Sequence, residues 1–307
     1  MISHETLGLS HGLAFGAEPE GPAPLEAAAT YSRIYAFGDS LSDAGNDYIA
    51  SFGVLPTSAI YYDGRFSNGP VWVQDLAKDL GLPAVTPSLA GGTDFAYGGA
   101  ETGSEPLHSV SPIDLPAQLA EFLAQVPKPS AHALYSLSIG ANDLLDAIPV
   151  YATNPTEAVS DVTTAVSNAV SFVSDLVADG ARNFVILNVP NLVVTPSEAG
   201  TAATATKLTL LYDQDLGKEL TALQQKDHLS IHLINTYALI DNAVAHPSQY
   251  GLTNVTTPVW TGNYEDPTSG TLNAHGSAQN GFLFFDHLHP TETGHTAIAN
   301  LALSKLT

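Results

Sequence analysis

Short apolar runs alternate along this chain with longer stretches in which apolar residues recur at helical spacing. Runs rich in β-branched and aromatic residues are typical of strands in a sheet, and they lie at 33–37, 93–97, 131–139, 184–189 and 231–234. Apolar residues three and four positions apart are typical of amphipathic helices, and they predict helices at 72–80, 115–126, 155–179, 203–226, 236–245 and 290–303. Strands and helices therefore follow one another along most of the chain.

This alternation predicts an α/β fold. A strand, a helix and a second strand form a right-handed crossover, which places helices on both faces of a parallel sheet. Residues 184–189 (FVILNV) are apolar or neutral throughout, as expected of a strand covered on both faces. We therefore expect a three-layer α/β/α sandwich with a central parallel sheet.

The pattern also suggests how the chain is divided. Residues 1–30 lack periodicity and end near a Pro22-Ala23-Pro24 break, which predicts an extended or poorly ordered lead-in. Residues 31–307 hold every predicted element and are expected to form one domain. Two long connections, 47–68 and 247–281, are of the kind that usually forms functional lids or walls. Their aromatic residues either wall an acyl or sugar cleft or pack the loops onto the core: Phe52, Tyr61, Tyr62, Trp260 and Tyr264.

Charge and composition exclude several classes of protein. The chain has 307 residues, of which 44% are apolar, and its 9 basic and 31 acidic residues give a net charge of −22. So negative a surface repels nucleic acid and anionic membranes, so neither is an expected partner. The absence of cysteine excludes disulfides and thiolate metal sites. No apolar stretch approaches 18 residues, so no transmembrane segment is expected.

The sequence gives only weak information on localisation. The first 20 residues lack both a basic region and a continuous apolar region, so no signal peptide of the usual kind is visible. Strong acidity and the lack of cysteine suit an extracellular enzyme, and we expect secretion on that basis. Nothing in the sequence indicates the oligomeric state.

Candidate chemistry gathers just beyond the predicted strands. Ser40 follows the first strand at the turn Gly38-Asp39-Ser40, where an α/β enzyme can present a nucleophile on a rigid sheet. Gly98 and Asn142 follow two other predicted strands, and they could offer a backbone N–H and a side-chain amide to an oxyanion. In parallel sheets, ligands bind at the carboxyl ends of the strands, so these groups are expected to converge.

A base for Ser40 is found near the end of the chain. Asp286 and His289 lie three residues apart in FDHLHP, a spacing that lets a carboxylate orient an imidazole across a turn. His287 is nearer in sequence to Asp286, but adjacent side chains point apart, so His289 is preferred. Taken singly, each of these groups could instead serve as a helix cap or turn residue. A metal site at His287 and His289 lacks convincing further ligands.

Together these blocks resemble the GDSL lipase/esterase family, the SGNH hydrolases. The resemblance rests on four blocks in family order, which are FGDSLSDAGN, DFAYGGA, IGANDL and FDHLHPTETGH, and on DGRFSNGPVWVQDLA at 63–77, as in the larger plant-type and bacterial secreted members. It implies a flavodoxin-like SGNH hydrolase fold, a Ser40–His289–Asp286 triad, and an oxyanion hole built from Ser40, Gly98 and Asn142. It implies no metal and no organic cofactor. Asp94 stands where these members usually carry Asn, which adds negative charge near the oxyanion site.

The family resemblance implies a serine esterase acting through an acyl-enzyme intermediate. We expect short- to medium-chain acyl or acetyl esters as substrates, carried on small molecules, lipids or polysaccharides. One alternative is a lipid acyltransferase or phospholipase of the same family. A second is a non-catalytic carbohydrate-binding module on an esterase fold, although all five presumed catalytic positions are intact.

Overall fold

The computed structural model describes residues 31–307 apart from 104–112, 199, 264–265 and 267. The expected lead-in at 1–30 and the aromatic residue Tyr264 lie outside the described residues. Among those described, no helix combines the length and the apolarity needed to cross a lipid bilayer.

A four-stranded parallel sheet lies at the centre of the molecule, as the sequence predicts. Its strands run in the order β1, β2, β3, β4, and each pairs in register with the next along all five of its residues. Their bounds are Ile34–Gly38 for β1, Leu134–Ser138 for β2, Asn183–Leu187 for β3 and Ser230–Ile234 for β4. All five residues of β1 and of β2 are buried, as expected of parallel strands with helices on both faces.

The predicted strand at 93–97 is wrong as a regular strand. This segment lies along the free edge of β1, where Ala36 donates to the carbonyl of Thr93 and Phe95 donates back to Ala36. Only an isolated parallel bridge between Ala36 and Asp94 is formed, and Asp94 also bridges to Pro87 on its other side. β1 therefore has the segment 93–97 along one edge and β2 along the other.

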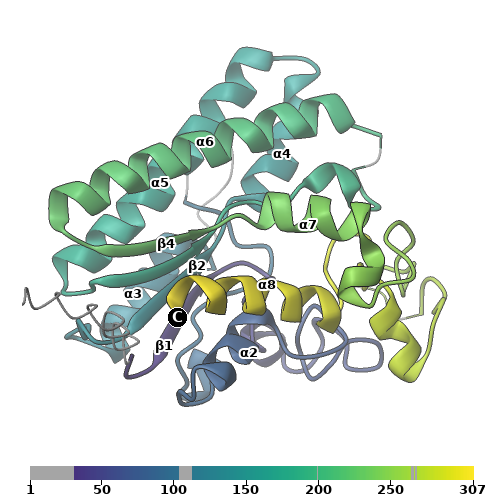
Figure 1. Cartoon of the computed structure of the whole chain (residues 1–307), viewed down its shortest axis with the longest axis horizontal. Helices are drawn as coiled ribbons and strands as arrows, with labels where there is room; N and C mark the ends of the chain where they lie inside the picture. Colours follow the sequence, from purple (N-terminus) through teal and green to yellow (C-terminus); the bar gives the residue numbers. More distant parts are fainter. Residues whose placement is uncertain (1–30, 104–112, 199, 264–265, 267) are drawn as a thin grey trace, which may run out of the picture.

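Helices cover both faces of the sheet (Figure 1). One face carries α3 (Leu115–Gln125), α4 (Ala141–Tyr151), α5 (Pro155–Ala178) and α6 (Ala202–Asp227). The other carries α2 (Trp72–Asp79) and α8 (Glu292–Leu306), with α7 (Thr236–Ala245) beyond the end of β4. The three layers confirm the predicted α/β/α architecture.

Alternate side chains of each strand contribute to the apolar cores on the two faces of the sheet. In β1, Tyr35 and Phe37 pack with the helices of the α5 side, whereas Ile34 and Ala36 pack with α2 and α8. Successive side chains of a strand point to opposite faces, so a strand buried on both sides needs apolar side chains at most positions, although β2 also buries Ser136 and Ser138. This requirement explains the uninterrupted apolar runs in the sequence.

Three further elements differ from the sequence prediction. A short helix α1 (Asn46–Ala50) lies within the expected loop, and α4 follows Gly140 directly, where no helix had been assigned. The last helix begins at Glu292 rather than at Pro290, because the hydroxyl of Thr291 caps it by accepting from Gly294. Pro290 thus belongs to the segment that carries His289.

Candidate active site

Ser40 lies at the point where the strand order reverses. The chain leaves β1, returns along one edge at 93–97, and then crosses to β2 on the other edge. Such a reversal opens a crevice at the carboxyl end of the central strand, which is where α/β proteins bind ligands. Ser40 comes two residues after β1 ends at Gly38.

The turn before Ser40 requires glycine. Gly38 has φ of +125°, and a Cβ at this position would lie 1.8 Å from the carbonyl oxygen of Ser138. The side-chain amide of Gln118 holds the same residue, since its Oε1 accepts from the N–H of Gly38 at 2.9 Å and its Nε2 donates to the carbonyl at 2.8 Å. The strand end is thereby fixed before the chain reaches Ser40.

The structure brings Ser40, His289 and Asp286 together in one hydrogen-bonded row. Nε2 of His289 lies 2.8 Å from Oγ of Ser40, and Nδ1 lies 2.8 Å from Oδ2 of Asp286. All three side chains are nearly inaccessible to solvent, with Ser40 7% exposed, Asp286 5% and His289 6%. His289 therefore joins the hydroxyl to the carboxylate through its two ring nitrogens.

Asp286 is held as a carboxylate by several donors. Its Oδ1 accepts the backbone N–H groups of Leu288 and His289 at 2.8 and 2.7 Å, while Oδ2 accepts the hydroxyl of Tyr61 at 2.6 Å. Burial alone raises the pKa of Asp286, but the charge and hydrogen bonds of His289, with the bond from Tyr61, lower it to about 2. Asp286 is accordingly ionised at neutral pH.

Tyr61 was not identified as a site residue from the sequence, where it was grouped with aromatic residues of the first long loop. Its ring is buried against Trp260 and Phe285, with centroid distances of 5.5 and 5.1 Å. Tyr61 and Trp260 are therefore buried and pack their loops onto the core. No local sequence signal links Tyr61 to Asp286, because 225 residues separate them.

The three expected oxyanion donors are not equally available. Within the described part of the chain, no protein acceptor takes the backbone N–H of Ser40. Asn142 uses one N–H of its side-chain amide to donate to the carbonyl of Ala100 at 2.8 Å, which leaves the second N–H. The N–H of Gly98, in contrast, donates to Oδ2 of Asp43 at 3.2 Å.

Asp43 organises the turn that follows Ser40. Besides Gly98, its carboxylate accepts the N–H groups of Gly45, Asn46 and Asp47 at 2.7, 2.6 and 3.2 Å. Burial raises the pKa of Asp43 to about 6, although these backbone bonds oppose the shift. Asp43 belongs to the FGDSLSDAGN block, but no feature of the sequence distinguishes it from its neighbours as a supporting residue.

Asp94 lies in the same buried network. Its two carboxylate oxygens accept the N–H groups of Ala44 and Ala96 at 2.5 and 3.0 Å, and its side chain is inaccessible to solvent. Burial, together with the charge of Asp43, raises the pKa of Asp94 well above its ordinary value of 3.8. Asp94 thus links the turn that follows Ser40 to the 93–97 segment through these hydrogen bonds to Ala44 and Ala96.

Other acidic and histidine side chains do not form a metal site. His287 is exposed and its Nε2 lies 3.0 Å from the carbonyl of Thr261, away from Ser40. Among the residues that the structure describes, no group of three or more histidine, aspartate or glutamate side chains is placed to hold a metal ion.

A small apolar cavity opens directly on Ser40 and His289. Its volume is about 40 Å³, and its most deeply buried apolar walls are Leu192, Ile240 and Phe284. A single water occupies about 10–15 Å³ on this measure, so the cavity has room for only a few heavy atoms. Its lining is almost wholly apolar apart from the site residues themselves.

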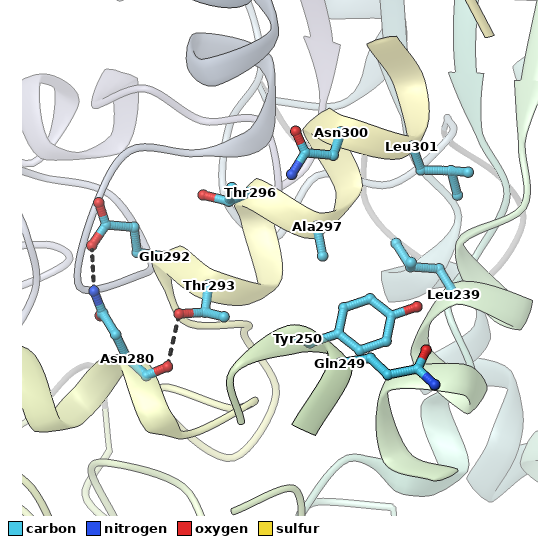
Figure 2. A pocket seen from close by; sticks show the side chains of 10 residues that line it. All are labelled: Leu239, Gln249, Tyr250, Asn280, Glu292, Thr293, Thr296, Ala297, Asn300 and Leu301. Carbon is cyan, nitrogen blue, oxygen red and sulfur yellow. Dashed lines mark hydrogen bonds between the residues drawn. The ribbon is translucent and has the colours of Figure 1, made fainter. Parts of the chain in front are cut away.

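Wider hollows also open on the described part of the chain, and two of them lie near the site. One, of about 360 Å³, borders Tyr61, Asp286 and His287. The other is a groove of about 630 Å³ beside α8 (Figure 2). In it, the side-chain amide of Asn280 donates to the carboxylate of Glu292, and the backbone carbonyl of Asn280 accepts from the hydroxyl of Thr293. α7 separates this groove from the cavity at Ser40, since Ile240 lines the cavity and Leu239 lines the groove.

Comparison with known proteins places this arrangement in a family. The model of the GDSL-like lipase/acylhydrolase family matches residues 34–302. The chain is 36% identical over 168 residues to a phosphatidylcholine-sterol acyltransferase of Aeromonas hydrophila, a match covering 54% of this chain and 47% of that protein. It is 27% identical over 288 residues to a thermolabile hemolysin of Vibrio parahaemolyticus, covering 89% of this chain and 63% of that protein.

The chain thus spans about half to two-thirds of the length of these two relatives. Among solved structures, an acetylxylan esterase of Geobacillus stearothermophilus superposes with a TM-score of 0.47 at 14% identity, covering 91% of this chain and 96% of that one. The family model, in contrast, extends from the first strand to the last helix. The chain therefore belongs to the GDSL-like lipase/acylhydrolase family.

Proposed function

We propose that this protein is a serine esterase that hydrolyses short-chain carboxylic esters through an acyl-enzyme intermediate. The observation that carries the proposal is the row Ser40–His289–Asp286, with 2.8 Å between each pair of interacting atoms. A serine hydroxyl is a poor nucleophile unless a base within hydrogen-bond distance removes its proton. His289 is so placed, and Asp286 orients it.

The first half of the reaction transfers the acyl group to the protein. Oγ of Ser40 attacks the ester carbonyl while Nε2 of His289 takes the hydroxyl proton, and the carbonyl oxygen becomes an oxyanion. The charge on Asp286 stabilises the imidazolium that forms. Collapse of the intermediate breaks the ester C–O bond, and His289 gives its proton to the leaving alcohol.

The second half releases the acid. Water attacks the acyl-serine, His289 takes a proton from that water, and the bond between Oγ and the acyl carbon breaks to restore Ser40. The N–H of Ser40 and the second amide N–H of Asn142 are the donors best suited to the oxyanion. Gly98 can join them only if its N–H leaves Asp43, so we assign it a secondary part.

The cavity at Ser40 supports a preference for short acyl groups. Leu192, Ile240 and Phe284 close its apolar end, and its volume of about 40 Å³ suits an acyl chain of about two to four carbons. The alcohol half of the ester is not confined by this cavity. Small alcohols, lipid backbones and polysaccharide hydroxyls all remain compatible with the site.

The test is hydrolysis of p-nitrophenyl esters from acetate to palmitate by the wild-type protein and by Ser40→Ala. We expect hydrolysis that falls off beyond butyrate and is abolished by the substitution. Activity that persists in Ser40→Ala would overturn the assignment of the nucleophile. An optimum at palmitate would overturn the assignment of the cavity.

Acyl transfer to an alcohol is a second candidate, favoured by the 36% identity with a phosphatidylcholine-sterol acyltransferase over 168 residues. In that case an alcohol replaces water in the second half of the reaction. Supplying 1-hexanol with p-nitrophenyl acetate distinguishes transfer from hydrolysis, because transfer converts the acetyl group to hexyl acetate whereas hydrolysis converts it to acetate.

Secretion, expected from the acidic composition, is likewise a proposal. Comparing the esterase activity of culture medium with that of cell extract of the source organism tests it.

A further inference from the structure

An uncharged apolar turn stands out on the surface of this strongly acidic protein. We define the apolar turn as residues 48–60 (YIASFGVLPTSAI), which contain no Asp, Glu, Lys, Arg or His, although 13% of the whole chain is charged. Its side chains include Phe52, which is 96% exposed, Val54, which is 61% exposed, and Ile49, which is 39% exposed. Single exposed apolar residues are common, but an almost fully exposed phenylalanine beside two further apolar side chains is not.

Phe52 occupies a backbone position that normally belongs to glycine. Helix α1 ends at Ala50, and the N–H of Phe52 donates to the carbonyl of Ile49 while the N–H of Gly53 donates to that of Tyr48. These two bonds define a helix terminus whose first residue beyond the cap is left-handed, and Phe52 has φ of +58° there. A side chain with a Cβ is disfavoured in this conformation, and an aromatic one is uncommon.

The rest of the turn holds Phe52 in place. The hydroxyl of Ser51 accepts the N–H of Leu55 at 2.8 Å and donates to its carbonyl at 3.1 Å, which closes the loop around Phe52. The apolar tip is thus presented on an ordered scaffold. Neither strain nor exposure at Phe52 contributes to folding, so the residue calls for an explanation outside the folded core.

Both ends of the apolar turn are tied to the candidate active site. At its start, α1 begins at Asn46, whose N–H donates to Asp43 in the turn that follows Ser40. At its end, Tyr61 donates its hydroxyl to Asp286. The apolar turn therefore joins two segments that support Ser40 and Asp286.

We propose that the apolar turn seats this protein on an electrically neutral lipid surface. Aromatic and aliphatic side chains at the tip can enter such an interface without burying any charge. A net charge of −22 repels anionic lipid, so the surface must carry no net negative charge. The inference rests on the proposed esterase function only for its purpose, which is to bring to Ser40 short-chain esters whose alcohol half is held in the lipid surface.

The experiment measures sedimentation with phosphatidylcholine vesicles, using Ser40→Ala so that hydrolysis plays no part. We expect this protein to bind the vesicles saturably, and to bind vesicles containing phosphatidylglycerol more weakly at low salt. Phe52→Gly in the same background should bind at least about tenfold more weakly, because burial of one phenylalanine side chain contributes one to two factors of ten. Val54→Ser should weaken binding to a smaller extent.

Controls separate this effect from misfolding and from failure of the esterase assignment. Glycine suits the left-handed conformation, so Phe52→Gly should be folded, with a Tm no lower than that of the parent. When Ser40 is retained, Phe52→Gly should hydrolyse soluble p-nitrophenyl acetate at a rate within about twofold of wild type. Leu233→Ser, at a leucine that is 37% exposed on β4, should bind vesicles as its parent does. Because binding is read without turnover, absence of ester hydrolysis would leave this result intact.

Four results would overturn the proposal. These are no binding to phosphatidylcholine vesicles, equal binding by Phe52→Gly, equal loss in Leu233→Ser, and stronger binding to anionic vesicles. A change from dimer to monomer on Phe52→Gly, seen by light scattering, would instead assign the apolar turn to an interface between two copies of this chain.

Discussion

The ring nitrogen Nε2 of His289 lies 2.8 Å from the hydroxyl oxygen of Ser40, although 249 residues separate the two in the chain. The sheet makes this contact possible, because Ser40 is fixed at the end of β1 while His289 is carried by the segment just ahead of α8, which packs beside it. Phe66 also packs near the imidazole, with 5.1 Å between ring centroids. The base is therefore held in position before any substrate arrives.

Removal of the Tyr61 hydroxyl tests the support of Asp286. We expect Tyr61→Phe to destabilise the protein by about 1.5–3 kcal/mol at pH 7, the usual contribution of a hydrogen bond to a charged group. Because the pKa of Asp286 is lowered to about 2 in the folded protein, the stability it contributes is present above its ordinary pKa of 3.8 and is lost as pH falls through 2. The deficit of Tyr61→Phe should therefore shrink between about pH 4 and pH 2, as measured by urea unfolding.

Tyr62→Phe is the matched control, because Tyr62 is 47% exposed and adjacent in sequence. It should unfold as wild type does at every pH. A deficit in Tyr61→Phe that stays constant down to pH 2 would show that the hydroxyl acts through packing rather than through Asp286.

Asn142→Ala tests the side-chain oxyanion donor. We expect kcat for p-nitrophenyl acetate to fall by about 10²–10³-fold with little change in KM, because the amide is needed chiefly when negative charge develops on the carbonyl oxygen. Steady-state kinetics give both constants. A rise in KM at unchanged kcat would mean that Asn142 binds the ester in its ground state instead.

Asp94→Asn tests the departure from the family pattern. Burial and the charge of Asp43 raise the pKa of Asp94 in the folded protein, so the folded state is increasingly disfavoured as pH rises from 3.8 through that raised pKa. An amide at this position does not titrate. We therefore expect the unfolding free energy of Asp94→Asn, relative to wild type, to improve as pH rises above 4 and to level off once Asp94 is ionised in the folded protein.

The prediction concerns how the difference in unfolding free energy changes with pH, and not its value at one pH. The side-chain oxygen of Asn can accept only one of the two N–H bonds that Asp94 receives from Ala44 and Ala96, and this loss lowers the stability of the variant at every pH. Urea unfolding at several pH values measures the slope directly. A difference between the two proteins that does not vary with pH would refute the raised pKa.

Ile240→Ala tests the closed end of the acyl cavity. Shortening this wall should move the optimum of the p-nitrophenyl ester series from acetate or butyrate towards longer chains, at a stability cost of about 2–5 kcal/mol. Leu239→Ala is the control on the same helix, because it faces the groove beside α8. An unchanged chain-length profile in Ile240→Ala, or an equal change in Leu239→Ala, would contradict the assignment.

Much of the architecture could be predicted because it follows from local patterns. The apolar run of β3 and the long periodic stretch of α5 can each be recognised from the local sequence alone. Their predicted positions therefore agree with the structure to within a few residues. The segment 93–97 was predicted as a strand on the same grounds. In the structure it forms only isolated bridges, from Asp94 to Ala36 and to Pro87, which a local pattern does not reveal.

The site could be predicted in outline but not in its supporting contacts. Ser40 and His289 were found because sequence blocks mark them, whereas the bond from Tyr61 to Asp286 depends on how two loops meet. The engagement of Gly98 by Asp43 likewise depends on the fold of the turn after Ser40. Contacts between residues far apart in sequence, with no motif to connect them, require the structure.

The most direct test of the central claim is to find the serine that a fluorophosphonate modifies. We predict one adduct per chain, located by peptide mass spectrometry on Ser40, absent from Ser40→Ala and formed much more slowly in His289→Ala. An adduct on a different serine, or undiminished labelling of Ser40→Ala, would contradict the account.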